Sequence, residues 1–177
     1  MRLPRTLISA VIDSLLAVGC ADKKAEGADS AVAAMQSTQE VTTLGGRVTI
    51  KIPADLQPLL EQEGMGVYMN DKGGVTVMAG DSPGGDSAAL MEMTMNNLKL
   101  KDPNLKVLGT GETQLGEQAA KTVDVQMKSD GKDVHMTMAL TTFDNKLFAI
   151  QVLGEQSKGD EVSKTAKAVF DSVKISK

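Results

Sequence analysis

The chain alternates apolar and polar residues in several short runs, which is the pattern of half-buried β-strands. These runs occupy residues 47–52, 67–69, 75–79, 105–110, 121–128, 133–142 and 146–153. Polar and glycine-containing segments join neighbouring runs and predict hairpin turns, at residues 70–74, 129–131 and 143–145. Residues 55–63 lack this alternation and are expected to form a helical turn or a loop.

Two segments show the helical period instead. The first begins at an N-cap, Asp86 or Ser87, and runs to about residue 100. Its predicted buried stripe consists of Ala88, Met91, Met95 and Leu98. The second covers residues 159–173, with an apolar stripe of Val162, Ala166, Val169, Phe170 and Val173. Strands joined by tight turns, with helices between their runs, predict an α+β fold in which an antiparallel sheet of about six or seven strands has flanking helices.

The N-terminal residues have the pattern of a bacterial lipoprotein leader. Arg2 and Arg5 precede an apolar run at residues 7–18, which is shorter than the roughly 20 residues that a spanning helix needs. The run ends in the sequence LAVGC at residues 16–20, which is typical of a lipobox, and this predicts lipidation at Cys20. The alternative is that Cys20 is an incidental buried thiol of a leader-like first helix.

This interpretation divides the chain into three parts. Residues 1–19 would be a signal peptide, residues 20–43 a flexible tether, and residues 44–177 a single α+β domain. Stable membrane anchoring needs at least two lipid signals, which the diacylglyceryl group of a bacterial lipoprotein supplies. The domain would then face the periplasm from the inner or the outer membrane, and Ala21 at the position after Cys20 favours the outer one.

Composition narrows the possible functions. Aromatic residues make up 2% of the chain and the formal net charge is -4. Aromatic platforms and a basic footprint are the means by which proteins bind nucleic acid, so nucleic acid is not an expected partner. Because Cys20 is the single cysteine, an intramolecular disulfide and a multi-cysteine metal site are excluded.

Candidate catalytic chemistry depends on the single histidine, His135. It lies on the strand face opposite Val134 and Met136, and it is either a structural strand residue or the general base of a tethered enzyme together with Asp124 or Asp133. No phosphate-binding loop of the G-x-x-x-x-G-K-[ST] type is present in the sequence. The sequence therefore predicts no catalytic residue and no cofactor.

Two other charged groups have a structural and a functional interpretation. The loop from Asp81 to Asp86 carries two carboxylates that could hold a cation, but a turn followed by an N-cap explains them as well, and no metal site is predicted. Near the end of the first helix, Lys99, Lys101 and Lys106 complement the helix dipole. In a tethered domain these lysines could also contact anionic lipid head groups.

Several segments resemble the DcrB family of envelope lipoproteins of Gram-negative bacteria. They are GRV at 46–48, IPADL at 52–56, VMAGDSP at 77–83, DPNLKV at 102–107 and the closing amphipathic helix. The resemblance implies a Mog1/PsbP-like fold and a non-enzymatic envelope role, linked to phage adsorption and to membrane or lipoprotein homeostasis. It carries over one site residue, the lipidated Cys20. Members of the family place Asp after that cysteine, whereas this chain has Ala21.

The expected function is therefore that of a lipid-anchored periplasmic binding or accessory protein. Its expected partners are the membrane, through the lipid on Cys20, and another envelope protein. The alternative is a tethered periplasmic enzyme that uses His135 with a nearby aspartate.

Overall fold

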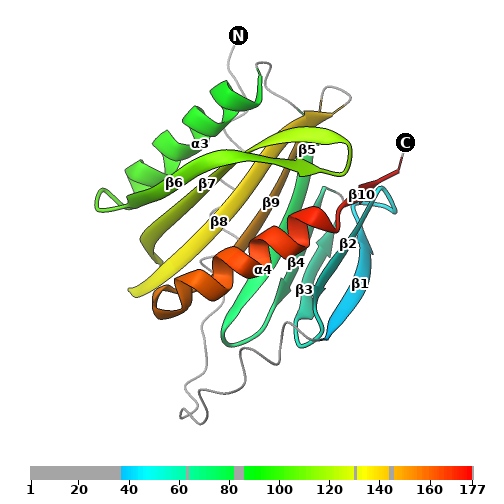
Figure 1. Ribbon diagram of the computed structural model, residues 1–177, viewed down its shortest axis with the longest axis horizontal. Helices are drawn as coiled ribbons and strands as arrows, with labels where there is room; N and C mark the ends of the chain where they lie inside the picture. The colour runs from blue at the N-terminus through cyan, green and yellow to red at the C-terminus, as the bar shows by residue number, and fades with distance from the viewer. Residues whose placement is uncertain (1–36, 63, 82–85, 130, 144–145, 177) are drawn as a thin grey trace.

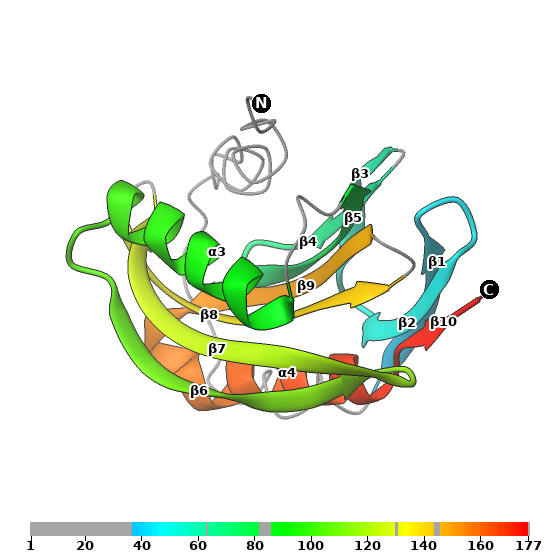
Figure 2. The same cartoon turned by 90° about the horizontal axis from the view of Figure 1, so that it is seen from above.

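Two antiparallel sheets and two long helices form the domain in the computed structural model, which describes residues 37–62, 64–81, 86–129, 131–143 and 146–176. The larger sheet has seven strands in the order β3-β4-β5-β9-β8-β7-β6, and the smaller has three in the order β1-β2-β10. Helix α4 crosses one face of the larger sheet and helix α3 lies over the other (Figures 1 and 2). The predicted α+β class with an antiparallel sheet is confirmed.

The strands are β1 (Thr38–Thr43), β2 (Val48–Pro53), β3 (Gln57–Gln62), β4 (Met65–Met69), β5 (Gly73–Asp81), β6 (Lys106–Leu115), β7 (Gln118–Ser129), β8 (Lys132–Phe143), β9 (Lys146–Glu155) and β10 (Lys174–Ile175). The helices are α3 (Ser87–Lys101), the short 3-10 helix η1 (Gln156–Lys158) and α4 (Gly159–Asp171). The predicted hairpins are confirmed by strand pairing, which joins Ser129 to Lys132 and Phe143 to Lys146.

Besides the two-residue strand β10, two segments form strands where none was predicted. Residues 57–62, expected as a helical turn or loop, are β3, an edge strand whose side chains are almost all exposed. A strand exposed on both faces has no alternation of apolar residues to reveal it. Residues 38–43, placed in the predicted tether of 20–43, are β1, which pairs along its whole length with β2. The leader, Cys20 and the tether up to residue 36 lie outside the described residues.

Each face of the larger sheet carries its own core. Under α4 and the smaller sheet lie branched and aromatic side chains, among them Ile50, Val77, Ile150, Val169 and Phe170. The predicted stripe of the last helix is confirmed, since all five of its residues are buried. On the α3 side, the core is rich in methionine and includes Met65, Met78, Met91, Met136 and Met138. Methionine fills irregular space, and here it takes the place of the missing aromatic residues.

The predicted face of α3 is partly wrong. Ala88 is exposed and Met95 is half-buried, while Leu90 and Thr94 occupy the buried face with Met91 and Leu98. Apolar residues occur on several sides of this helix, so their spacing does not single out one face. Thr94 is accommodated because its hydroxyl donates to the carbonyl of Leu90 at 2.8 Å.

The predicted N-cap of α3 is confirmed, as the Asp86 side chain accepts from the backbone N–H of Ala89. Among the described residues, no helix is long and apolar enough to cross a membrane.

The ionisation of the chain's single tyrosine is sensitive to the packing of β3 against β4. Tyr68 is buried in the α4-side core, and its hydroxyl donates to Glu61 Oε1 at 2.6 Å. Burial first, and this bond to a carboxylate second, disfavour the tyrosinate and raise the pKa of Tyr68 to about 12.

We predict that tyrosinate absorbance rises with a midpoint near pH 12 in the native protein and near pH 10 in urea. Because the folded pKa is raised, the stability that neutral Tyr68 contributes is complete below pH 10 and declines as the pH rises toward 12. The substitution Glu61→Gln should lower the native midpoint. A native midpoint near 10, with near-ultraviolet circular dichroism unchanged, would contradict the buried environment.

Candidate functional site

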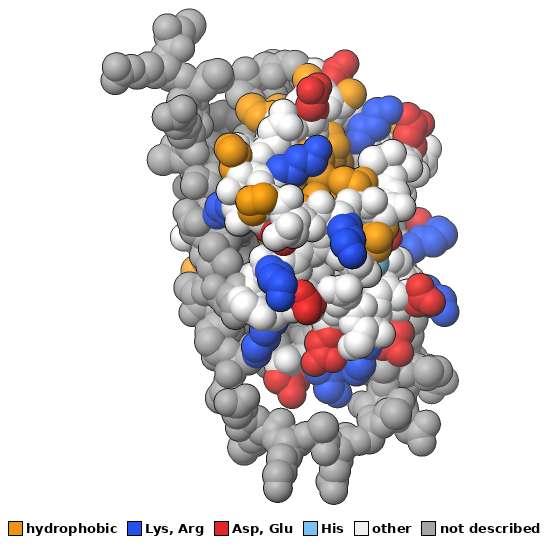
Figure 3. Space-filling view, turned by 90° about the vertical axis from the view of Figure 1, so that its left-hand side faces the viewer, with side chains coloured by type: hydrophobic (Ala, Val, Ile, Leu, Met, Phe, Trp, Pro, Cys, Tyr) orange, Lys and Arg blue, Asp and Glu red, His pale blue; other side chains and the backbone are white. Residues whose placement is uncertain are grey.

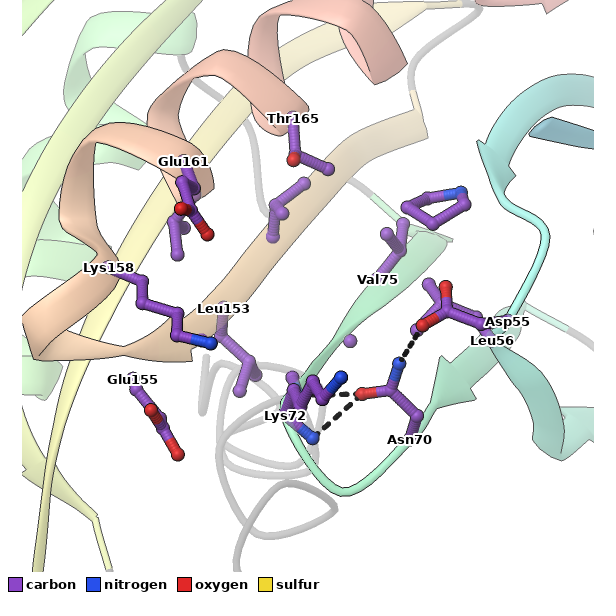
Figure 4. Close-up of a pocket in the computed structure, with 16 residues that line it drawn as sticks. Asp55, Leu56, Asn70, Lys72, Val75, Leu153, Glu155, Lys158, Glu161 and Thr165 are labelled. Atoms are coloured by element: carbon purple, nitrogen blue, oxygen red, sulfur yellow. Dashed lines mark hydrogen bonds between the residues drawn. The ribbon is translucent and has the colours of Figure 1, made fainter. Parts of the chain in front are cut away.

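A pocket of about 130 Å³ opens where the start of α4 meets the ends of β2, β5 and β9 (Figure 4). Its apolar lining consists of Pro53, Leu56, Val75, Val152, Leu153 and Val162. These residues come from four segments that are far apart in sequence, so the pocket exists only in the folded domain. It continues the α4-side core to the surface of the molecule.

Charged side chains of both signs surround this apolar floor. Figure 4 shows Glu155, Lys158 and Glu161 on the side of α4, and Lys72 with Asp55 across the opening. No side chain among Lys72, Glu155, Lys158 and Glu161 has an ion-pair partner in the described part of the chain. The mouth therefore offers two cations and two carboxylates whose charges are free to meet a ligand.

The wall opposite α4 is fixed by one asparagine. Asn70 Oδ1 accepts from the backbone N–H groups of Lys72 and Gly73, at 2.8 and 3.0 Å, which holds the β4–β5 turn. Its Nδ2 donates to Asp55 Oδ2 at 2.8 Å and ties the turn to the segment after β2. The turn was predicted from the sequence, but its use as a pocket wall was not, because nothing local points to Asp55.

Paired glycines bring α4 close to the sheet beside the pocket. Gly73 of β5 pairs with Gly154 of β9, which pairs in turn with His135 of β8. A Cβ at Gly154 would lie 2.7 Å from Val162 Cγ2, so only glycine leaves room for this part of α4. The bare backbone at Gly154, which itself lines the pocket, allows this close approach of α4.

The volume of the pocket limits what can enter it. An apolar cavity of about 150 Å³ holds a single benzene ring, so this pocket suits one branched or ring-shaped side chain rather than a cofactor. Within the described ranges, no cluster of three potential metal ligands is present. The chemistry on offer is the binding of an apolar group flanked by polar or charged ones.

A buried polar cluster lies under α4 next to the pocket. His135 is 3% exposed, and its Nε2 lies 2.7 Å from Asp124 Oδ1 on the neighbouring strand β7. Asp124 also accepts from the hydroxyl of Thr137 at 2.6 Å and from the hydroxyl of Ser163 of α4 at 3.0 Å. The cluster joins two strands and a helix through one carboxylate.

The geometry of this cluster differs from that of a catalytic relay. In a serine–histidine–aspartate relay the hydroxyl and the carboxylate use different ring nitrogens. Here Ser163 Oγ at 3.2 Å and Asp124 both approach Nε2. Nδ1 is buried without a hydrogen-bond partner among the described residues, and a Cβ built on Gly159 would lie 2.6 Å from it. The ring is covered by the helix, so a substrate has no access to it.

Of the two aspartates that the enzyme alternative names, Asp124 lies beside His135 and Asp133 does not. Asp133, two residues before His135 and next to the β7–β8 turn, is exposed, and its Oδ1 lies 3.4 Å from Lys128 Nζ. His135 is the helix-covered strand residue that the structural interpretation describes. Sequence reasoning missed Ser163, although a serine close to the apolar stripe of an amphipathic helix is a signal for a buried hydrogen bond.

The cluster fixes the first turns of α4 and thus the pocket wall. Ser163 and Gly159 contact the cluster, while Lys158, Glu161 and Val162 of the same turns line the pocket. Loss of the Ser163 hydroxyl should therefore make the first turns of α4 less rigid, although Ser163 itself does not line the pocket.

We predict that Ser163→Ala lowers the free energy of unfolding by about 1 kcal/mol, because Asp124 loses a partly buried hydrogen-bond donor. The matched control is Ser157→Ala in η1, where the side chain is exposed and the effect should stay within about 0.5 kcal/mol. Urea denaturation measures both. Equal effects of the two substitutions would show that the cluster does not hold the helix.

Solved structures with the same fold come from several bacteria. The solution structure of cyanobacterial PsbP (CyanoP) from Synechocystis sp. PCC 6803 has a TM-score of 0.61 at 13% identity and covers 87% of this chain and 98% of its own. LpqN of Mycobacterium tuberculosis, described as involved in cell envelope biogenesis, has a TM-score of 0.51 at 17% identity and covers 80% of this chain and 91% of its own. At these identities the likeness shows the PsbP-like fold alone.

Sequence comparison is more specific. The inner membrane lipoprotein DcrB of Shigella flexneri is 25% identical over 183 residues, which covers 97% of this chain and 99% of that protein. The DcrB family model matches residues 49–172, which include every described residue of the pocket and the buried cluster. The chain belongs to the DcrB family.

Proposed function

We propose that this chain is a lipid-anchored protein of the bacterial cell envelope, held to the membrane through Cys20 with its domain in the periplasm. The alignment to an inner membrane lipoprotein along nearly its whole length supports this proposal, because it extends over the leader as well as the domain. That relative gives no support to the preference for the outer membrane drawn from Ala21. We therefore place the anchor in the inner membrane.

The domain acts by binding an envelope protein. One observation carries this proposal: an apolar pocket of single side-chain size lies within a ring of charged residues, and four of them have no ion-pair partner in the described part of the chain, namely Lys72, Glu155, Lys158 and Glu161. Interfaces of this type bury one anchor side chain in a pocket and surround it with polar contacts. The partner segment would carry a leucine- or phenylalanine-like side chain flanked by charges of both signs.

The covered ring of His135 gives the enzyme alternative no support, since neither its nitrogens nor Ser163 reach the pocket. The roles implied by the resemblance, in phage adsorption and in membrane or lipoprotein homeostasis, both fit a protein that recruits a partner at the membrane. The relation of LpqN to envelope biogenesis is consistent with them.

Photo-crosslinking in living Gram-negative cells tests the pocket as the binding site. A photoreactive amino acid at Lys72, on the rim, should give a discrete adduct that mass spectrometry identifies as one envelope protein. The matched control is the same amino acid at Lys167, an exposed position of α4 outside the pocket, which should give none.

A blocking variant makes the test specific. Thr165 lines the pocket from a half-exposed position, so Thr165→Phe should fill the space and leave the fold intact. We predict that it abolishes the Lys72 adduct while the melting temperature stays close to that of the wild type. An adduct that survives Thr165→Phe, or that forms equally from Lys167, would contradict binding in the pocket.

A further inference from the structure

Exposed apolar side chains gather at one corner of the domain. Leu100 is 82% exposed, Leu108 50% and Val107 46%, and the remaining exposed large hydrophobic residue of the described chain, Leu59, lies on β3 at the opposite edge of the sheet. Figure 3 shows hydrophobic side chains with Lys or Arg side chains among them in the upper half of the face that includes the α3–β6 end of the molecule. We call the segment Lys99–Leu108 the α3–β6 corner.

The end of α3 is fixed so that Leu100 points away from the sheet. Leu98 is buried against the sheet, and Leu100 follows it two positions later, about 200° around the helix. Asp102 then ends the helix with its N–H on the carbonyl of Leu98 at 2.9 Å. Its carboxylate accepts from the N–H of Lys128 on β7 at 2.6 Å, which ties the corner to the sheet.

The start of β6 exposes two consecutive apolar residues. In a regular strand Val107 and Leu108 would point to opposite faces. The register with β7 shifts here, since Val107 pairs with Val125 while Gly109 pairs with Asp124, and Leu108 is left without a partner. This bulge leaves both side chains exposed on an edge strand, where no packing in the domain requires them to be apolar.

The exposed charges of the corner are all positive. Lys99, Lys101 and Lys106 are exposed, whereas the one acidic residue of the segment, Asp102, is 7% exposed and is bonded to backbone N–H groups. This local excess occurs in a chain with a net charge of -4. Apolar residues flanked by lysines are the combination that binds the interface of an anionic membrane.

We propose that the α3–β6 corner docks on anionic phospholipid, with Leu100, Val107 and Leu108 in the boundary between head groups and acyl chains. Lys99 and Lys106 contact the lipid phosphates, and their aliphatic stems lie along the apolar surface. The inference rests on the proposed lipid anchor. Fully extended, the residues from Cys20 to Ser37 reach about 60 Å at most, so the anchor confines the domain to within that distance of the bilayer, and docking of the corner then sets the orientation of the domain.

Tryptophan fluorescence tests this orientation, because the chain has no tryptophan of its own. The mature acylated protein carrying Leu100→Trp is reconstituted into phosphatidylcholine vesicles with a third of phosphatidylglycerol, made with or without brominated acyl chains. We expect bromine to quench the Leu100→Trp emission about twofold or more, because the indole reaches the acyl boundary. The matched control is Leu59→Trp, at the far edge of the sheet. Leu59 is exposed to a similar extent as Val107, and the emission of a tryptophan at this position should not be quenched.

Lysine variants and lipid composition test the electrostatic part. Added to Leu100→Trp, the pair Lys99→Gln and Lys106→Gln should reduce the quenching, and so should vesicles without phosphatidylglycerol. The control substitution Lys164→Gln, at an exposed position of α4, should leave it unchanged. If the quenching stays the same in the lysine variants and in vesicles without phosphatidylglycerol, the proposed contact of the lysines with anionic lipid is overturned.

The outcomes separate this inference from the anchor beneath it. Acylated protein that floats with the vesicles but shows no quenching, or equal quenching at Leu100→Trp and Leu59→Trp, would overturn the docking of the corner and leave the anchor standing. Protein that is recovered without acyl groups would overturn both.

Discussion

The structure depends on one constraint: the seven-stranded sheet is apolar on both faces, and each face must be covered. β5 and β9 show this, since Met78 and Ala149 belong to the core on the α3 side while Val77 and Ile150 belong to the core under α4. A sheet of this kind cannot be stable with one layer of helix. The closing helix and the smaller sheet supply the second cover, and the pocket opens where that cover ends beside Gly154.

The polar cluster under α4 is a consequence of the same constraint. Apolar packing alone does not fix the position of α4 along the strands, and the hydrogen bond from Ser163 to Asp124 adds a specific contact between the helix and β7. The cost of burying His135 and Asp124 is offset by these mutual bonds and by the partial exposure of the Asp124 side chain. The arrangement therefore links the packing of the domain to the geometry of its binding site.

Much of this fold can be predicted from sequence where periodicity is strong. The stripe from Val162 to Val173 and the alternation of Met136 and Met138 follow directly from contact with a core. β1 and β3 are not predicted because they are edge strands with mostly exposed side chains. Such strands need backbone hydrogen-bond partners but no alternation of apolar residues, which is the signal that sequence analysis uses. The face of α3 escapes because that helix is apolar on several sides.

The candidate site is less accessible to sequence reasoning. The sequence suggests His135 and Asp124 as a possible pair from their strands. Tertiary packing alone brings Ser163 to that pair, and it alone brings Lys72, Lys158 and Glu161 together around the pocket. Each of these residues is an ordinary surface or turn residue in its own segment. The anchor is the opposite case, because the sequence around Cys20 predicts it without any structure.

That anchor is the central claim, because the proposed partner binding at the pocket and the proposed docking of the α3–β6 corner both require the domain to be held at a membrane. The most direct test is the intact mass of the protein extracted from membranes, compared with Cys20→Ser. We predict a chain that begins at Cys20 and carries about two or three acyl chains, which the variant lacks. An unmodified chain that retains Met1 would contradict the account.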